Sequence, residues 1–421
     1  MLATLRRRNF ALIWVGGLIS LTGDRAMLTA LPFYVYQQTG STLRMAALFT
    51  AYYLPMVLFG SVAGVFVDRW DRRRIMIGTN LLQASVMVLL LLVRSRASLW
   101  LMYPVVFVEI SASMFFAPAE GAIIPSLVST EQLVPANALG SLNNNIARLV
   151  GPPIGGALLS LFGLGGVVIA DSGSFLIAGA LASRVSIVPK PSLPQARPPD
   201  VSSAGISPWV KLWREWRDGL RLVRRDRLLA ALFTVNSVTS FGGSMIDPLY
   251  APFVGAVLGG GPAALGWLST TGAVGGLLAG LLVGHVGSKV PPRWLTAYGT
   301  LATGLLMLMM YNQTVLPVVM VLNFLMFVPV VVAGVGAQTM LQNGVADNFR
   351  GRVYGALNTT TAVIGLVSLW LAGILGALFG IVPMLSVAAS ITLLAGGLAL
   401  ALLPKGMAPH DANMEEASTT S

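Results

Sequence analysis

The chain has 421 residues, of which 55% are hydrophobic and only 10% charged, and it contains no cysteine. Soluble domains carry about 25% charged residues, so this composition excludes an ordinary soluble enzyme, a disordered chain and a disulfide-stabilised secreted domain. It predicts a membrane protein with several spans, and we attribute the net charge of +11 to membrane loops and not to nucleic-acid binding.

Apolar runs of about 20 residues, the length that crosses a bilayer as a helix, follow one another along the chain. The first run follows a basic stretch and lacks a small-residue cleavage site, so we predict a retained span and not a signal peptide. We predict twelve transmembrane helices, at 9–36, 43–67, 75–93, 98–125, 137–161, 165–187, 227–255, 263–286, 293–311, 315–342, 352–378 and 381–403.

The predicted fold class is therefore an all-α membrane protein with twelve transmembrane helices in two six-helix bundles. The N-terminal bundle covers 1–187 and the C-terminal bundle covers 227–403, with a cytoplasmic linker at 188–226 between them. Residues 404–421 are polar and predict a disordered cytoplasmic tail.

The positive charges predict the orientation of the spans. With the N-terminus inside, the inner segments hold 22 of the 27 Lys and Arg residues and the outer loops hold three. Cytoplasmic loops of membrane proteins are enriched in these residues. We therefore expect a multi-pass, monomeric protein of the cell inner membrane, in contact with the lipid bilayer, with both termini in the cytoplasm.

The loop between the second and third spans reads GVFVDRWDRRR (64–74) and combines a glycine, an acid and a basic run. It resembles the loop motif G-x-x-x-D-R-x-G-R-R/K of the major facilitator superfamily, which is matched by Gly64, Asp68, Arg69, Arg72 and Arg73. Asp71 departs from the motif because it replaces a glycine, so we expect a less tight turn there.

The resemblance implies that this loop gates the inner side of the protein. A glycine allows two helices to approach closely, and the acid can accept hydrogen bonds from Arg side chains and from a facing helix N-terminus. Anchoring of the arginines to anionic lipid is the alternative.

Two opposite charges fall near the middle of the fourth and fifth spans. At about 1.5 Å per residue, Glu109 and Arg148 lie at similar depths. An ionised group in hydrocarbon requires a partner or water. We predict that the two residues pair at the centre of a site for substrate or protons; a purely structural ion pair is the alternative.

Other acids also lie within the predicted spans. Asp24 in the first span is a candidate for proton coupling, because a carboxyl group in the membrane can take up and release a proton; pairing with the adjacent arginine is the alternative. Asp247 in the seventh span is a further candidate; support of the bend at the proline after it is the alternative. We expect Asp171 and Glu120 to have structural roles.

The fifth span contains ARLVGPPIGGALLSLFG (147–163), in which small residues surround a proline pair. It resembles the antiporter motif G-x-x-x-G-P-x-x-G-G of the same superfamily, matched by Gly151, Pro152, Gly155 and Gly156, with Ala147 in place of the first glycine. Small residues allow close helix packing in a bilayer, and proline removes a backbone hydrogen bond. The resemblance implies an exporter; helix packing without directional meaning is the alternative.

The linker changes character along its length. Its first part is rich in Pro and Ser, whereas Trp209, Trp213 and Trp216 recur at helical spacing among basic residues in the segment 209–227. This pattern predicts an amphipathic helix on the inner leaflet. A solvated linker is the alternative.

The two halves of the chain share features at a constant offset of 216 residues. The matched residues are Gly60 with Gly276, Gly64 with Gly280, Pro32 with Pro248, Glu131 with Asp347, and Arg73 with Lys289. An internal repeat of six spans is typical of transporters, in which two bundles can move against each other.

Several segments together resemble the twelve-span drug–proton antiporters, especially the branch with macrolide-efflux and enterobactin-exporter proteins. They are RNFALIWVGGLISLTGD (8–24), FFAPAEGAIIPSLV (115–128), NNNIARLVGPPIGG (143–156) and FRGRVYG (349–355). The resemblance implies proton-coupled efflux of amphipathic or hydrophobic small molecules by alternating access. The fourth span lacks the R-x-x-x-G motif that many proton antiporters carry there.

The alternatives within this fold are a lipid or lysophospholipid flippase and a siderophore exporter. A non-transporting membrane sensor or scaffold is the alternative from another class. With two His, no Cys and no phosphate-binding loop, the sequence predicts neither an enzyme nor a metal site, and no cofactor. The expected partners are a small-molecule substrate and protons.

Overall fold

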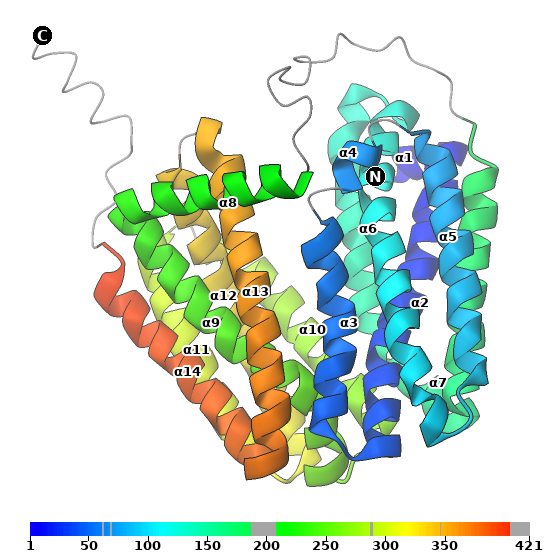
Figure 1. Ribbon diagram of the computed structural model, residues 1–421. Helices are drawn as coiled ribbons and strands as arrows, with labels where there is room; N and C mark the ends of the chain where they lie inside the picture. The colour runs from blue at the N-terminus through cyan, green and yellow to red at the C-terminus, as the bar shows by residue number, and fades with distance from the viewer. Residues whose placement is uncertain (61–62, 68–69, 187–207, 287–288, 346, 405–421) are drawn as a thin grey trace, which may run out of the picture. The chain divides into compact units, whose positions relative to one another are not determined.

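The computed structural model describes residues 1–60, 63–67, 70–186, 208–286, 289–345 and 347–404. These residues form helices joined by short connections, and no β-strand occurs within the described ranges (Figure 1). The all-α prediction is confirmed.

The first half of the chain forms long helices and short accessory turns. Their bounds are α1 Leu2–Leu5, α2 Arg8–Thr39, α3 Thr42–Phe59, α4 Ala63–Val67, α5 Arg72–Val88, α6 Met102–Leu127 and α7 Leu133–Ser183, with 3₁₀ turns at Leu89–Leu92, Arg96–Leu101 and Thr130–Gln132. These bounds follow the first six predicted spans within a few residues.

Helix α7 contains both the fifth and the sixth predicted spans. The two parts meet at Gly163, whose φ of 65° and ψ of −167° are not helical. Only glycine adopts this backbone conformation readily. The chain therefore reverses at one residue, and the described residues contain eleven helical segments long and apolar enough to cross a membrane, one of which holds two predicted spans.

The second half begins with the helix of the linker and continues, within the described residues, with six helices long and apolar enough to cross a membrane. The bounds are α8 Pro208–Arg225, α9 Arg227–Pro252, α10 Pro262–Val286, α11 Pro292–Tyr311, α12 Leu316–Gly344, α13 Asp347–Phe379 and α14 Ile381–Leu402, with a π-helical turn at Phe253–Val257.

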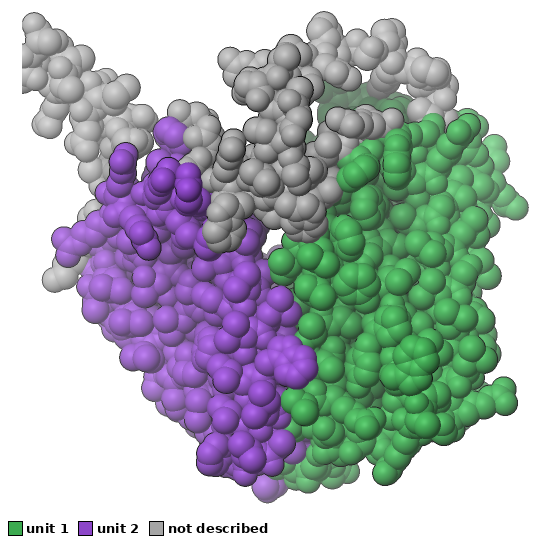
Figure 2. Space-filling view, in the orientation of Figure 1, with its two compact units in different colours: residues 1–208, 254–270 green, residues 209–253, 271–421 purple. Residues whose placement is uncertain are grey.

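Two compact units divide the chain (Figure 2). The first unit consists of Met1–Pro208 with Val254–Thr270, and the second of Trp209–Phe253 with Thr271–Ser421. In the first unit α7 packs along α2 and α5, and α6 packs along α3 and α5. In the second unit α11 packs along α12 and α14, and α9 packs along α13 and α14.

Helix α8 packs against its own unit. Trp216, Leu220 and Val223 lie in an apolar cluster with residues of α9, α12 and α13, and the indole Nε1 of Trp216 donates to the hydroxyl of Thr360 at 3.1 Å. We expected the apolar residues of this segment to face the inner leaflet. From Trp216 onward they face protein, because neighbouring helix ends provide an apolar surface at that place.

Candidate functional site

Three carboxyl side chains of the first unit lie close enough to interact electrostatically. They are Asp24 on α2, Glu109 on α6 and Asp171 on α7. Tyr52 on α3 lies within range of all three and is only 9% exposed. We call the three acids the carboxyl cluster. Four helices thus bring polar groups together inside an otherwise apolar bundle, which provides the chemistry needed to bind and release protons or cations.

Glu109 is held by a neutral partner. Its side chain is 7% exposed, and its Oε1 accepts a hydrogen bond from Nε2 of Gln83 on α5 at 3.2 Å. Gln83 is itself buried. An amide donor orients the carboxyl group without supplying a full positive charge, so Glu109 can exist with or without a proton.

The predicted ion pair between Glu109 and Arg148 is wrong. Within the described residues Glu109 bonds to Gln83, whereas Arg148 is exposed and lies in electrostatic range of Arg25. The reason is the rotational position of Arg148 on its helix. Ala147, which is fully buried, turns toward the interior of the unit, and the next residue along an α-helix points about 100° away.

Asp24 is half-buried on α2 and has Arg25 as its adjacent cation. Arg25 is in range of both Asp24 and Arg148, so two positive charges lie close together on the side of Asp24. Asp24 thus lies in electrostatic range of the adjacent cation and of the other two acids.

Asp171 is the most enclosed member of the carboxyl cluster. It is 1% exposed and lies in range of the Ser174 side chain, but neither carboxyl oxygen accepts a hydrogen bond of normal geometry from the described residues. We expected a structural role for Asp171, but a structural carboxyl group is normally hydrogen-bonded. The polar run DSGSF inside an apolar span was the signal that could have identified it.

Asp247 belongs to the second unit and is not part of the carboxyl cluster. It is half-buried on α9 and lies in electrostatic range of Tyr311, which is 1% exposed. The ring of Tyr311 meets that of Phe253 edge-on, with 5.3 Å between the centroids. Asp247 thus lies beside an aromatic group of its own unit.

The loop motif acts within the first unit through its arginines. Nη1 of Arg72 donates to the carbonyl of Ala122 near the end of α6 at 2.8 Å. The guanidinium of Arg73 donates to the carbonyls of Ala182, at 3.3 Å, and Ser183 at the end of α7. Cations stabilise the C-terminal ends of helices, where carbonyl groups lack partners. Gly64 lies in α4, and Asp68 and Arg69 lie outside the described residues.

The departure at Asp71 has a structural explanation. Asp71 is the N-cap of α5, and its Oδ1 accepts a hydrogen bond from the backbone N–H of Arg74 at 2.7 Å. Its φ of −65° and ψ of 114° are accessible to any residue. The expected loosening of the turn is therefore replaced by a cap, a position for which Asp is among the preferred residues.

The antiporter motif forms two close helix contacts. A Cβ added at Gly151 would lie 2.9 Å from the carbonyl oxygen of Thr22, and one at Gly155 would meet the backbone of Ala26, both on α2. On the other side, a Cβ at Gly156 would lie 2.5 Å from the carbonyl oxygen of Pro262 at the start of α10.

Residues of α10 make equally close contacts with α7. A Cβ at Gly266 would lie 2.5 Å from the carbonyl oxygen of Pro152, and the hydroxyl of Thr270 donates to the carbonyl of Leu149 at 3.0 Å. The small residues are therefore required by the packing of α7 against α2 and against the first part of α10.

A family model described as Major Facilitator Superfamily matches residues 13–241 and 232–418, nearly the whole chain. The chain belongs to the Major Facilitator Superfamily. This confirms the family inferred from the loop and antiporter motifs, and the chain is a transporter of this superfamily with drug-efflux relatives.

Two relatives in the superfamily are efflux proteins by name. Macrolide efflux protein A of Streptococcus pyogenes is 28% identical over 66% of this chain and 67% of its own length. Multidrug efflux pump Tap of Mycobacterium bovis is 27% identical over 86% of this chain and 85% of its own length. The crystal structure of the nucleoside transporter NupG matches 94% of this chain and 100% of its own, with a TM-score of 0.71 and 13% identity, which shows a common fold.

Proposed function

We propose that this protein exports amphipathic or hydrophobic small molecules in exchange for protons, by alternating access of its two units. The carboxyl cluster is the observation that carries the proposal. In a superfamily transporter with efflux relatives, acids within the membrane are the groups that can couple proton movement to substrate movement.

Asp24 and Glu109 are the proposed coupling acids. Glu109 has a neutral hydrogen-bond partner, and Asp24 is the more exposed of the two. Because a carboxyl group must lose its proton to attract a cationic substrate, a proton and such a substrate compete for the same group. Release of the proton on one side and its uptake on the other would then drive export.

The loop and antiporter motifs have supporting roles in this proposal. Arg72 and Arg73 fix the inner ends of α6 and α7, and the glycines of the fifth span allow α2, which carries Asp24, to lie against α7. Arg148 and Asp247 are candidate substrate contacts. The protein is proposed to work as a monomer in the cell inner membrane, without enzymatic activity or a cofactor.

Transport into everted membrane vesicles tests this function. Uptake of a radiolabelled macrolide and of ethidium is measured with and without an imposed pH gradient, for the wild type, Asp24→Asn and Glu109→Gln. We expect gradient-driven uptake by the wild type and its loss in both variants. Asp226→Asn is the matched control, since Asp226 caps α9 and asparagine caps equally well.

Two results would contradict the proposal in different ways. Equal uptake by the wild type with and without the gradient would exclude proton exchange. Full gradient-driven uptake by both variants would exclude these two acids as the coupling groups while leaving proton exchange in place.

The proposed orientation is tested by labelling single cysteines, since the natural chain has none. We expect Ser95→Cys, between the third and fourth spans, to react with a membrane-impermeant maleimide added to intact cells. Thr130→Cys, between the fourth and fifth spans, should react only after the cells are opened. The reverse pattern would show the opposite orientation.

A further inference from the structure

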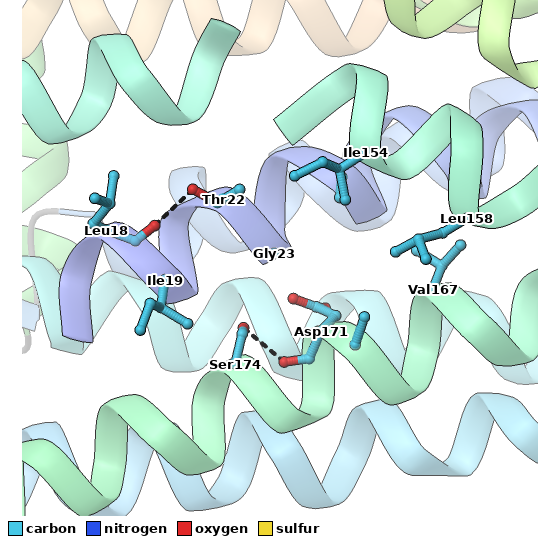
Figure 3. Close-up of a pocket in the computed structure, with 11 residues that line it drawn as sticks. Leu18, Ile19, Thr22, Gly23, Ile154, Leu158, Val167, Asp171 and Ser174 are labelled. Atoms are coloured by element: carbon cyan, nitrogen blue, oxygen red, sulfur yellow. Dashed lines mark hydrogen bonds between the residues drawn. The ribbon is translucent and has the colours of Figure 1, made fainter. Parts of the chain in front are cut away.

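A partly open cavity of about 290 Å³ lies in the first unit, between α2 and the two parts of α7 (Figure 3). Its walls are mainly aliphatic and include Leu18, Ile19, Ile154, Leu158, Val167 and Ala170. Ligand pockets commonly have volumes of about 300–1,000 Å³. The volume of this cavity therefore suits a small organic molecule.

The polar groups of the cavity leave one acceptor available. The hydroxyl of Thr22 donates to the carbonyl of Leu18, and the hydroxyl of Ser174 donates to the backbone carbonyl of Asp171, each at 2.7 Å. The side chain of Asp171 lies in range of the Ser174 side chain, but neither of its carboxyl oxygens accepts a hydrogen bond of normal geometry from the described residues. Figure 3 shows Asp171 beside Gly23 and Ser174 in the cavity lining.

Gly23 keeps space for this carboxyl group. A Cβ added at Gly23 would lie 2.5 Å from Oδ1 of Asp171 and 2.5 Å from the hydroxyl oxygen of Ser174. The backbone of α2 thus approaches the acid as closely as a glycine permits. An unpartnered acid in such apolar surroundings requires a compensating group.

The cavity lies deep within the membrane-spanning part of the unit. Asp171 follows Gly163 by eight residues and Ile154 precedes it by nine, which places both about 12–14 Å from that turn along their helices. The hydrocarbon core of a bilayer is about 30 Å thick. Ile154 and Ala170 are exposed, so a ligand can reach the cavity from the membrane-embedded surface of the unit.

We propose that this cavity binds a small organic ammonium ion with an apolar body, whose N–H group donates to the Asp171 carboxylate. The aliphatic walls accommodate the body, and the ammonium group supplies both the charge and the hydrogen bond that Asp171 lacks. Charge-assisted hydrogen bonds of this type are among the stronger ones in proteins. Because Asp171 belongs to the carboxyl cluster, the bound cation also changes the electrostatic environment of Asp24 and Glu109.

Direct binding tests this site without reference to transport. The probes are fluorophenyl-butylamine and the matched alcohol fluorophenyl-butanol, followed by fluorine NMR in lipid nanodiscs with empty nanodiscs subtracted. We expect the wild type to bind the amine about 10- to 100-fold more tightly than the alcohol, the range of a hydrogen bond to a charged group. Asp171→Asn should remove this preference and leave binding of the alcohol unchanged.

Further variants keep the result interpretable. Ala170→Phe places a larger side chain in the cavity lining and should weaken binding of both probes, whereas Asp226→Asn, the same acid-to-amide change outside the cavity, should alter neither. Equal binding of amine and alcohol by the wild type would overturn the proposal, as would an amine preference that survives in Asp171→Asn. Loss of gradient-driven export with this binding pattern intact would contradict the proposed function and not this site.

Discussion

The two units share a scaffolding contact and differ in the polar groups within their spans. In the first unit, Arg73 at the start of α5 donates to carbonyls at the end of α7. In the second, Nη2 of Arg293 at the start of α11 donates to the carbonyl of Leu400 at the end of α14, at 2.6 Å. In both units an arginine beginning the third span thus binds the end of the sixth.

The acids do not follow this repeat. At the offset of 216 residues, Asp24, Glu109 and Asp171 correspond to Ser240, Leu325 and Val387. The second unit therefore retains the helix contacts but not the carboxyl cluster. The helix contacts are therefore common to both halves, whereas the acids proposed for proton coupling lie in the first.

The largest expected difference between the units concerns export. Glu109→Gln should reduce gradient-driven uptake into everted vesicles to the level of vesicles without the protein, because it removes a proton-binding group. Asp247→Asn in the second unit should retain more of the uptake, because Asp247 lies beside aromatic residues and outside the cluster. An equal loss in both variants would show that the coupling chemistry is shared between the units.

Close glycine contacts should matter equally in the two units. In Gly155→Ala the new Cβ contacts the backbone of α2, and in Gly304→Ala the new Cβ lies 2.5 Å from the backbone nitrogen of Leu393. We expect each to destabilise the protein by about 1–3 kcal/mol, measured by thermal unfolding in detergent. Gly280→Ala, with no atom within 4 Å of its Cβ, is the control; a comparable loss there would refute the packing explanation.

The arginine contacts should differ in their contribution to stability. Arg73→Met removes hydrogen bonds from a charged donor and should lower the unfolding free energy by about 1.5–3 kcal/mol. Arg293→Met should lower it less, because the guanidinium is buried (7% exposed) and its Nε and Nη1 have no hydrogen-bond partner among the described residues, so its removal also removes two unsatisfied buried donors. Urea or thermal unfolding in detergent measures the difference, and a larger loss for Arg293→Met would reverse this ranking.

The smallest expected effects concern the caps. Asp71 caps α5, and Asp226 caps α9. Oδ1 of Asp226 accepts a hydrogen bond from the backbone N–H of Leu229 at 2.9 Å. Asp71→Ala and Asp226→Ala should each lower stability by about 1 kcal/mol, and the Asn variants should be close to neutral. If Asp71→Asn were as unstable as Asp71→Ala, the carboxylate would have a role beyond capping.

The sequence predicted the helices well because their signal is local. Runs of apolar residues and the clusters between them follow from the needs of a bilayer, so the predicted span ends agree with the helix bounds within a few residues. The junction at Gly163 also lies between two predicted spans, although a continuous helix assignment covers both.

The site was harder to predict because it depends on how helices are rotated about their axes. Depth along a span suggested that Glu109 and Arg148 would pair, but depth does not specify direction, and Gln83 is the partner of Glu109. Asp171 was predicted to be structural, and not part of the site, for the same reason. The offset of 216 aligned Arg73 with Lys289, whereas Arg293, one helical turn later, makes the corresponding bond.

The single-residue junction at Gly163 also constrains how the protein is made. A span that is followed by a flexible loop can insert into the membrane before the next span has been synthesised. Here Gly163 is the one residue with non-helical φ and ψ between the two spans, so we expect the pair to enter the bilayer together as a helical hairpin. Such an insertion event would deliver the antiporter motif and Asp171 at the same time.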